Sequence, residues 1–509
     1  MPHYESSRRA FLRLAGAAAL GWLAPSPTFA RGAAGDLAFG TPWAPAAAPD
    51  RWTTVDAILA RIKPPVFANR DFLVTDFGGV ADGQKDCTAA IRRAVAACSA
   101  AGGGRVVVPE GAFLTGAIHL RTGVNLHLAD GAILRFSRDP RNYLPLVFTR
   151  WEGVELMNYS PFIYAFGQRN IAITGRGTLD GQASEEYWWP WKGGAGRAGA
   201  DQSAGRQRLM DMGMKGVPVA ARLFGEGHYL RPNFIQPYRC TGVLVEGVTI
   251  VNSPMWEIHP ALCSNVTIRD VTINSHGPNN DGCDPESCRD VLIEKCRFDT
   301  GDDCIALKSG RNNDGRRLHV PVENVVVRDC IMADGHGGVV IGSEISGGAR
   351  NIFAEKCRMD SPRLDRALRI KTNSVRGGLV EHVYMRDVTI GQLAEAVVTV
   401  DYFYEEGDAG PFAPIVRDVE LRRVTSSKSK YAMRLRGYAR DPIQDVRLVD
   451  CAFDGVSDAD VVENVRGLKL MNVKINGRVR NDEITRRAAP QAPRRAESGR
   501  APLFTGQAT

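Results

Sequence analysis

Two adjacent carboxylates, Asp302 and Asp303, lead into an apolar run with Lys308 in the segment TGDDCIALKSG (residues 300–310). Neighbouring carboxylates repel each other, and this crowding raises the pKa of one of them. A carboxyl group that keeps its proton can act as a general acid, while an ionised neighbour acts as a base. An isolated pair of aspartates is more often a solvated turn, so the interpretation depends on the segments around it.

Four segments of the chain match one another around this pair. They are NDGCDPES (280–287), DDCIALKS (302–309), HGGVVIGS (336–343) and RALRIKTN (366–373). Placed in register, they put Asp281 beside Asp303 and Asp302 beside His336. If the segments stack as neighbouring strands, three carboxylates and an imidazole form one patch.

The fourth segment adds two cations to this patch. Arg369 and Lys371 are two residues apart on a predicted strand, so their side chains project from the same face. Carboxylates, a histidine and cations gathered on one face are a constellation expected of an active site.

The elements that would position these residues are repeats. From residue 242 a sequence repeat with alternating apolar residues recurs along the chain. Its copies begin at residues 242, 265, 290, 324, 351, 382, 418, 445 and 467. The alternation predicts two short strands per copy with a bend between them. Repeats this short bury their apolar faces only by stacking, so we predict an all-β fold, a right-handed parallel β-helix with coils about 4.8 Å apart. A β-propeller fits less well, since its blades need about four strands per 40–50 residues.

The same register accounts for several of the eleven cysteines. Cys296, Cys330, Cys357 and Cys451 occupy one repeat position, where the other copies carry valine. They are expected to be buried thiols in an apolar stack. The absence of CxxC spacing disfavours a metal cluster, and the odd total disfavours a disulfide framework. A local bridge between Cys283 and Cys288 stays open.

The β-helix domain is expected to span residues 71–478. A helix from about Asp86 to Ala100, ended by three glycines, is predicted to cap its open end. Residues 31–70 form a lead-in segment. Residues 182–239 are a glycine-rich insertion, and long loops on solenoids tend to surround the binding face.

Both ends of the chain are expected to lie outside the solenoid. Ser7-Arg8-Arg9 before a short apolar run is typical of a twin-arginine signal peptide, here residues 1–30, and predicts a periplasmic or secreted protein without a membrane span. Residues 479–509, rich in Ala, Arg and Pro, are predicted to be a disordered tail. These end segments carry much of the net charge of +7, so a nucleic-acid binder is not indicated.

Four motifs, NNDGCD, GDDCIALKSG, GHGG and RIKT, resemble the four signatures of glycoside hydrolase family 28, the polygalacturonases. DFGGVADGQKDCTAAI and VVVPEGAFLTG are similar to the amino-terminal segment of pectin-acting β-helices. The resemblance covers about residues 70–475. One departure is Asn280, where the family usually has threonine, but Asp281 after it is kept.

This resemblance implies roles for the clustered residues. By family position Asp302 is the general acid, kept protonated by the crowding of like charges. Asp281 and Asp303 hold and deprotonate the attacking water, and His336 hydrogen-bonds within the cluster.

The resemblance also implies how the substrate is held. Arg369 and Lys371 pair with a uronic carboxylate, and Tyr404 in VDYFYEE matches a substrate-contacting tyrosine. A core aromatic remains an alternative for Tyr404. The implied partner is a pectic polysaccharide or an oligogalacturonide, and we expect no cofactor, no metal and a monomer.

The sequence indicates less directly whether the cleavage inverts or retains the anomeric configuration. The family inverts configuration, for which acid and base usually stand about 6.5–9.5 Å apart, whereas the coil spacing suggests roughly 5 Å. Spacing alone would indicate retention. We follow the family, because the aligned site offers no separate nucleophile.

Three other functions were weighed. A rhamnogalacturonan hydrolase stays open, although RIK favours a uronate at the cleavage point. A pectate lyase holding Ca²⁺ with aspartates would lack GDDC, GHG and RIKT. A non-catalytic polysaccharide-binding β-helix would not need all three aspartates.

The insertion predicts where along a polymer the enzyme cuts. Trp188, Trp189 and Trp191 lie just before the coils of the predicted site. Such a loop would close one end of the groove, and its indoles would stack on a terminal sugar or anchor the loop to the solenoid. We expect exo-hydrolysis that releases galacturonate from the non-reducing end.

Overall fold

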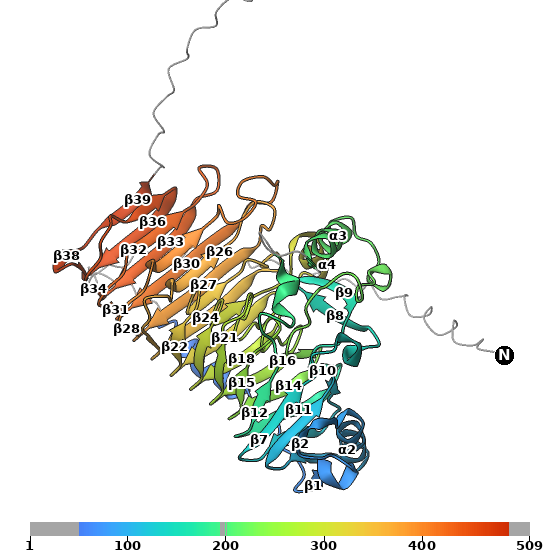
Figure 1. Cartoon of the computed structure of the whole chain (residues 1–509). Helices are drawn as coiled ribbons and strands as arrows, with labels where there is room; N and C mark the ends of the chain where they lie inside the picture. Colours follow the sequence, from blue (N-terminus) through green and yellow to red (C-terminus); the bar gives the residue numbers. More distant parts are fainter. Residues whose placement is uncertain (1–49, 194–198, 200, 488–509) are drawn as a thin grey trace, which may run out of the picture. The chain divides into compact units, whose positions relative to one another are not determined.

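The computed structural model describes residues 50–193, 199 and 201–487, and the residues from Arg51 onward belong to one compact unit. Its strands stack as successive coils along one axis, which Figure 1 shows as parallel rows of arrows. The predicted parallel β-helix is therefore confirmed. The predicted signal peptide lies outside the described residues.

The coils build two long sheets, each parallel except at its last strand. The first long sheet contains β1 (Asp71–Leu73), β3 (Gly104–Val108), β6 (Val124–Leu128), β11 (Arg169–Gly175), β14 (Thr241–Glu246), β16 (Ser264–Arg269), β18 (Arg289–Glu294), β21 (Val322–Arg328), β24 (Ala349–Glu355), β27 (Leu379–Arg386), β30 (Ile415–Arg422), β33 (Ile443–Val449), β36 (Val465–Met471) and β39 (Glu483–Arg487). The second contains β2 (Asp82–Asp86), β4 (Gly111–Thr115), β7 (Ala132–Phe136), β12 (Thr178–Asp180), β15 (Thr249–Val251), β17 (Thr272–Ser275), β19 (Arg297–Thr300), β22 (Ile331–Asp334), β25 (Arg358–Met359), β28 (Thr389–Ile390), β31 (Thr425–Ser426), β34 (Ala452–Phe453), β37 (Val473–Ile475) and β38 (Arg478–Arg480).

A third sheet forms the remaining wall and carries the predicted site. Its early strands are β5 (Ile118–His119), β10 (Ile163–Phe166) and β13 (Ile235–Tyr238), and its later strands are β20 (Ile305–Leu307), β23 (Val339–Ile341), β26 (Arg366–Lys371), β29 (Ala396–Asp401), β32 (Tyr431–Arg436) and β35 (Val461–Glu463). Single bridges through Ile258 and Cys283 connect the two groups. The segment that holds Asp281 is thus part of the same wall as β20.

Each repeat bends between its two strands at a residue with left-handed backbone. Gly247, Asp270 and Asp329 occupy this position in three copies, with φ of 79°, 53° and 55°. Glycine adopts this conformation without strain, and aspartate tolerates it better than most residues. The apolar positions on either side of the bend point inward and form one continuous core.

The cysteine stack is confirmed. Cys296, Cys330 and Cys357 are buried in successive coils, and Cys451 is buried further along. All eleven cysteines of the chain are buried free thiols in this structure. Cys283 and Cys288 therefore form no bridge here.

Helix α2 (Thr88–Ala100) covers one end of the solenoid, and the other helices lie along its sides. The capping helix is confirmed as α2, which begins where Asp86 Oδ1 accepts a hydrogen bond from the Thr88 N–H at 2.8 Å. Its Ile91 and Val95 enter the core at the end of the coils. The others are α1 (Thr53–Arg61), α3 (Ser203–Met214) and α4 (Asn312–Leu318), with 3₁₀ turns η1 (Val74–Phe77), η2 (Pro140–Tyr143), η3 (Trp189–Lys192) and η4 (Val219–Ala221).

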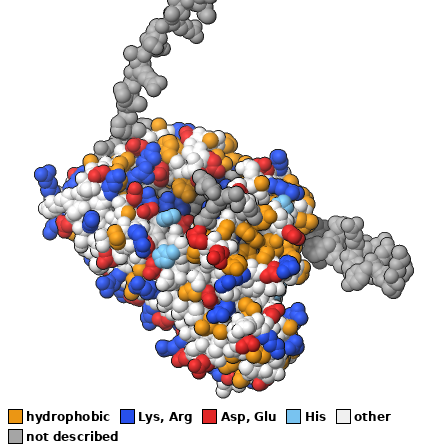
Figure 2. Space-filling model, viewed as in Figure 1, with side chains coloured by type: hydrophobic (Ala, Val, Ile, Leu, Met, Phe, Trp, Pro, Cys, Tyr) orange, Lys and Arg blue, Asp and Glu red, His pale blue; other side chains and the backbone are white. Residues whose placement is uncertain are grey.

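Within the described residues no helix is long and apolar enough to cross a membrane. Figure 2 shows Lys and Arg side chains interspersed with Asp and Glu over the visible face, in agreement with the nearly balanced charge expected of the solenoid.

The structure corrects several predicted boundaries. The lead-in segment contains α1, whose Val55 and Ile58 pack on the outer face of the first long sheet against Val326. The insertion ends before β13, and a second excursion, the hairpin β8 (Val147–Trp151) and β9 (Val154–Asn158), was not predicted. Residues 479–487 of the predicted disordered tail lie in or between β38 and β39, and the rest of that tail lies outside the described residues.

Candidate active site

Backbone stacking brings the three predicted aspartates together. The Gly282 N–H donates to the Asp303 carbonyl at 3.0 Å, which places Asp281 against Asp303, and the His336 N–H donates to the Asp302 carbonyl at 3.0 Å. One carboxylate oxygen from each aspartate lies within 4.8 Å of the others. The predicted register of the first three segments is therefore confirmed.

The fourth segment is displaced by one residue from its predicted register. Val339 pairs with Leu368, not with Arg369, which instead lies beside Val340. A shift of one residue exchanges the two faces of a strand. Because Leu368 takes the inward position beside Val339, Arg369 and Lys371 face outward, on the side of the aspartates.

The carboxylates differ in environment. Asp303 is fully buried and Asp281 nearly so, whereas the Asp302 side chain is 19% exposed. His336 Nδ1 lies 3.0 Å from Asp302 Oδ1, and the Asp303 N–H donates to the same oxygen at 2.9 Å. Asp302 is thus the carboxylate that remains accessible to a ligand.

The charges assign the protons differently from the sequence-based expectation. Burial and the charge of Asp302 raise the pKa of Asp281 well above its usual value. Burial also acts to raise the pKa of Asp302, but the hydrogen bond from His336 and the charge of Lys371 outweigh it and lower that pKa. The same hydrogen bond raises the pKa of His336 to about 9. Burial and neighbouring charge thus raise the pKa of Asp281 and not that of Asp302, which is opposite to the expectation that crowding raises the pKa of Asp302.

The predicted substrate-binding residues lie beside the acids. Lys371 Nζ is 2.6 Å from Asp303 Oδ2, and Arg369 NH1 is 3.5 Å from Asp303 Oδ1. Both cations lie over the ring of Tyr404, at 5.3 and 5.5 Å from its centroid. The structure brings all seven predicted residues into one cluster, and Tyr404 is its partly exposed edge.

Lys308 belongs to this cluster although its role was not predicted. Its Nζ lies 3.6 Å from Asp281 Oδ2, 3.4 Å from Glu344 Oε2 and 4.3 Å from the centroid of the Trp256 ring. The signal was present, since Lys308 stands in the segment that begins with Asp302. Glu344 follows β23 directly, but its part in the cluster becomes visible only in three dimensions.

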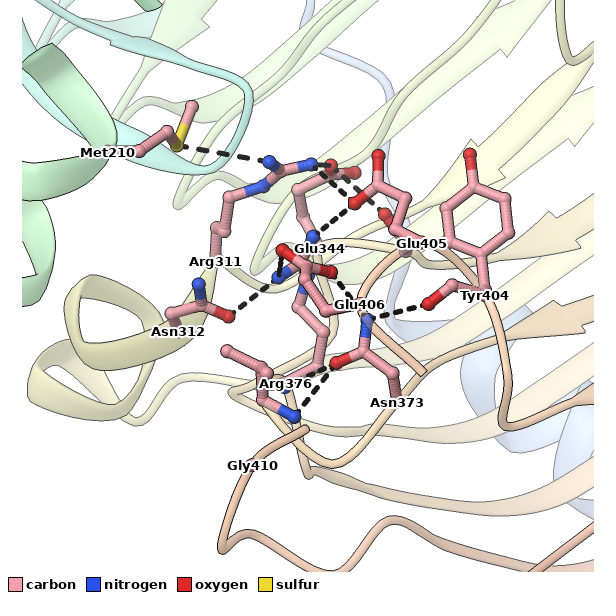
Figure 3. Close-up of polar contacts among 12 residues, drawn as sticks. Met210, Arg311, Asn312, Glu344, Asn373, Arg376, Tyr404, Glu405, Glu406 and Gly410 are labelled. Atoms are coloured by element: carbon pink, nitrogen blue, oxygen red, sulfur yellow. Dashed lines mark hydrogen bonds and ion pairs between the residues drawn. The ribbon is translucent and has the colours of Figure 1, made fainter. Parts of the chain in front are cut away.

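A buried ion network supports this edge of the site. Figure 3 shows Arg311 and Arg376 converging on Glu344 and Glu405: Arg311 lies 2.8 Å from Glu344, and Arg376 lies 2.6 Å from Glu405. The loop after β29, which carries Tyr404, is thereby fixed to the segments after β20 and β26. The network positions the aromatic edge of the site.

The insertion lies against the coil that precedes Asp281. Trp189 Nε1 donates to the Ser253 carbonyl at 2.8 Å, and its ring fills the space where a side chain at Gly277 would be. Trp188 is buried and packs edge-on against Tyr143 and Phe162. Trp188 is therefore an anchor of the loop and is not placed to stack on a sugar.

The carboxylate spacing also bears on metal binding. Three oxygens within 4.8 Å of one another are close enough to hold a cation. The positive charge that a metal ion would supply is already provided by Lys371 beside Asp303 and by Lys308 beside Asp281. The cluster therefore does not need an ion to balance its carboxylates.

Comparisons with known proteins agree with this site. A model of glycosyl hydrolases family 28 matches residues 225–474. The crystal structure of an exopolygalacturonase from Thermotoga maritima is similar with a TM-score of 0.81 and 44% identity, over 85% of this chain and 97% of that chain. A probable polygalacturonase of Vitis vinifera is 29% identical over 394 residues, 73% of this chain and 72% of its own length. An exo-poly-alpha-D-galacturonosidase of Dickeya chrysanthemi is 25% identical over 358 residues, 66% of this chain and 57% of its own length.

A parallel β-helix whose third sheet carries clustered aspartates and cations defines a glycosidase of acidic polysaccharides. This chain belongs to glycoside hydrolase family 28.

Proposed function

We propose that this protein is an exo-acting polygalacturonase that hydrolyses α-1,4-galacturonosyl linkages and releases galacturonate from the non-reducing end. The observation that carries the proposal is the contact of Asp303 with Lys371 and Arg369 inside a cluster of three aspartates. Acid–base groups and carboxylate-binding cations thus occupy one site. The similarity to an exopolygalacturonase of Thermotoga maritima supports the exo mode.

In the proposed mechanism Asp302 gives its proton to the glycosidic oxygen. Protonated His336 supplies that proton: transfer from Nδ1 to the carboxylate, over the 3.0 Å hydrogen bond, leaves a neutral imidazole and a neutral carboxylic acid. Asp302 then protonates the leaving oxygen as the bond to the sugar breaks.

The water is activated on the other side of the cluster. Asp303 lies 2.6 Å from Lys371 Nζ and 3.5 Å from Arg369 NH1, and in the proposed mechanism it accepts the proton of the attacking water. Asp281, whose pKa is raised by burial and by the charge of Asp302, orients the water by hydrogen bonding.

We propose inversion of configuration despite the close spacing. Oxygens within 4.8 Å match the roughly 5–5.5 Å typical of retaining enzymes. However, Asp303 is held by Lys371 and Arg369, and Asp281 lies beside Lys308. Carboxylates paired in this way are poor nucleophiles, so a direct attack by water is favoured.

The digestion of polygalacturonate tests the proposed function. We expect viscosity to fall slowly relative to the reducing ends formed, galacturonate to be the early product, and the rate to be unchanged by EDTA. A rapid fall in viscosity with mixed oligomers would overturn the exo mode alone. Loss of activity in EDTA together with ultraviolet-absorbing unsaturated products would replace hydrolysis by a lyase reaction.

We also propose that the protein is exported through its twin-arginine segment and acts as a monomer without binding nucleic acid. Arg8 and Arg9 before the apolar run support export. Replacing both by lysine should retain the protein in the cytoplasm on cell fractionation, and light scattering should give the mass of one chain.

A further inference from the structure

The insertion contributes one cation, Lys192, from a turn that packs on the coils before the acids, whereas Arg369 and Lys371 come from a later coil. Lys192 ends η3, the short turn that Trp189 fixes to the solenoid through its hydrogen bond to Ser253. Trp189 also contacts Gly277, four residues before Asp281. The later coil is that of β26. Cations therefore come from segments that precede and follow the acids along the solenoid.

Lys192 is partly buried, and its ammonium group has unused hydrogen-bond donors. Among the described residues it has no hydrogen bond and no ion pair, although the charges of Glu152 and Asp302 act on it. Glu152 is already paired with Arg206 at 2.7 Å, and Asp302 is bonded to His336. Burial lowers the pKa of the Lys192 ammonium, which is the cost of holding it without a counter-ion.

A second cation near Lys192 adds positive potential without competing for a ligand. Arg231 is fully buried, and NH1 donates to the carbonyls of Pro254 and Pro278 at 2.9 and 2.6 Å, while NH2 donates to Asn279 at 2.8 Å. All these partners are uncharged. Arg231 thus fixes the turn before Asp281 and leaves Lys192 as the cation with donors available.

We propose that Lys192 binds the carboxylate of the terminal galacturonate, the sugar that is released, while Arg369 and Lys371 bind the carboxylate on the other side of the scissile bond. This inference rests on the proposed function. Two uronates flank each bond that is cleaved, and two sets of cations flank the acids. Lys192 belongs to the insertion that adjoins the site. The same loop would therefore recognise the end of the polysaccharide chain and bind the carboxylate of its terminal sugar.

The test compares two substrates that differ in one charge. They are digalacturonate and its analogue in which only the carboxyl group of the non-reducing sugar is methyl-esterified. We expect the wild-type enzyme to prefer the free acid by about 10- to 100-fold in kcat/KM, the range of one charge-assisted contact. Lys192→Met should reduce this preference to about threefold or less, mainly by raising KM for the free acid, and Lys192→Arg should restore part of it. Lys215→Met, which removes an exposed lysine of the same insertion, should behave as the wild type.

The outcomes separate this inference from the proposed function. An active Lys192→Met variant that keeps the wild-type preference would overturn the role of Lys192 and leave the hydrolase intact. A wild-type enzyme that releases galacturonate from neither substrate would overturn the proposed function, and the inference with it. If Lys192→Met unfolds at a lower temperature, the decision passes to Lys192→Gln, which removes the charge but keeps a polar side chain: a preference reduced to about threefold or less supports the ammonium site, and an unchanged preference contradicts it.

Discussion

The later strands of the third sheet, β20 to β35, have the same architecture throughout. Their charged residues are buried at one end and partly exposed at the other. Around β20 and β26, Asp303 and Lys371 are almost fully buried, and one oxygen of Asp281 has no hydrogen bond. Around β32 and β35, Arg434 pairs with Asp401 at 3.1 Å and Arg436 with Glu463 at 3.3 Å, all with partly exposed side chains.

This difference shows that an outward-facing position on the third sheet does not by itself make a charged residue catalytic. Ion pairs that remain hydrated contribute little to stability and shift the pKa values of their members little. Carboxylates that are buried together must share protons, and this sharing produces an acid and a base. The active end of the sheet is the end against which the hairpin β8–β9 and the insertion after β12 pack, with Gly153 hydrogen-bonded to Arg311 and Trp189 beside Gly277.

The largest expected effect comes from removing the acid at the buried end. Asp302→Asn should reduce turnover by about 10²–10⁴-fold without unfolding the protein, because an amide cannot protonate the leaving oxygen. Glu463→Gln, at the exposed end, should change turnover by less than about twofold. Steady-state rates on polygalacturonate check both variants. Near-wild-type hydrolysis by Asp302→Asn would remove it from the mechanism.

A smaller effect is expected for the cations. Arg369→Ala should raise KM for uronate substrates by about 10- to 100-fold, since a charge-assisted contact is lost. Arg434 lies two strands further along in the same row of the sheet, beside Thr399, which itself pairs with Arg369, and Arg434→Ala should leave KM within about twofold. Equal effects of the two substitutions would show that binding extends over the exposed end.

The smallest effect in this series is a change in pH dependence. Because the pKa of His336 is raised to about 9 by Asp302, His336 is protonated below that pH, and kcat/KM should fall as the pH rises through about 9. The stabilisation from this pair is complete below the ordinary histidine pKa of about 6.5 and is lost as the pH rises to about 9.

His336→Gln should remove this basic limb and lower kcat. His382→Gln provides the matched control, because His382 pairs with Asp418 at 2.7 Å on the first long sheet, outside the site. A basic limb that persists in His336→Gln would assign it to another group.

Much of this arrangement was predictable from sequence, because the repeats report directly on the core. Alternating apolar residues predicted the coils, and the stack of Cys296 and Cys330 followed from one repeat position. Asp281 and Asp303 could be placed together because their segments share the register that the core imposes.

What could not be predicted depends on contacts between distant segments. The pKa of Asp281 is raised by burial, and that of Asp302 is lowered by His336 and Lys371, and no sequence pattern contains either the burial or these contacts. The one-residue displacement of the fourth segment follows from a signal within it: apolar Leu368 and Ile370 alternate with Arg369 and Lys371, and aligning the segments by their motifs overrides that alternation. The hairpin β8–β9 does not contain the repeat pattern, so the pattern could not predict it.

The most direct test of the account is a nuclear magnetic resonance time course of trigalacturonate digestion by the wild-type enzyme. We predict saturated galacturonate as the first monomer, released initially as the β anomer from the α linkage. Water attacks the anomeric carbon from the face opposite the leaving oxygen and gives a proton to Asp303, while Asp302 protonates the leaving oxygen. Initial release of the α anomer would contradict the direct attack of water, and unsaturated products would contradict hydrolysis at this cluster altogether.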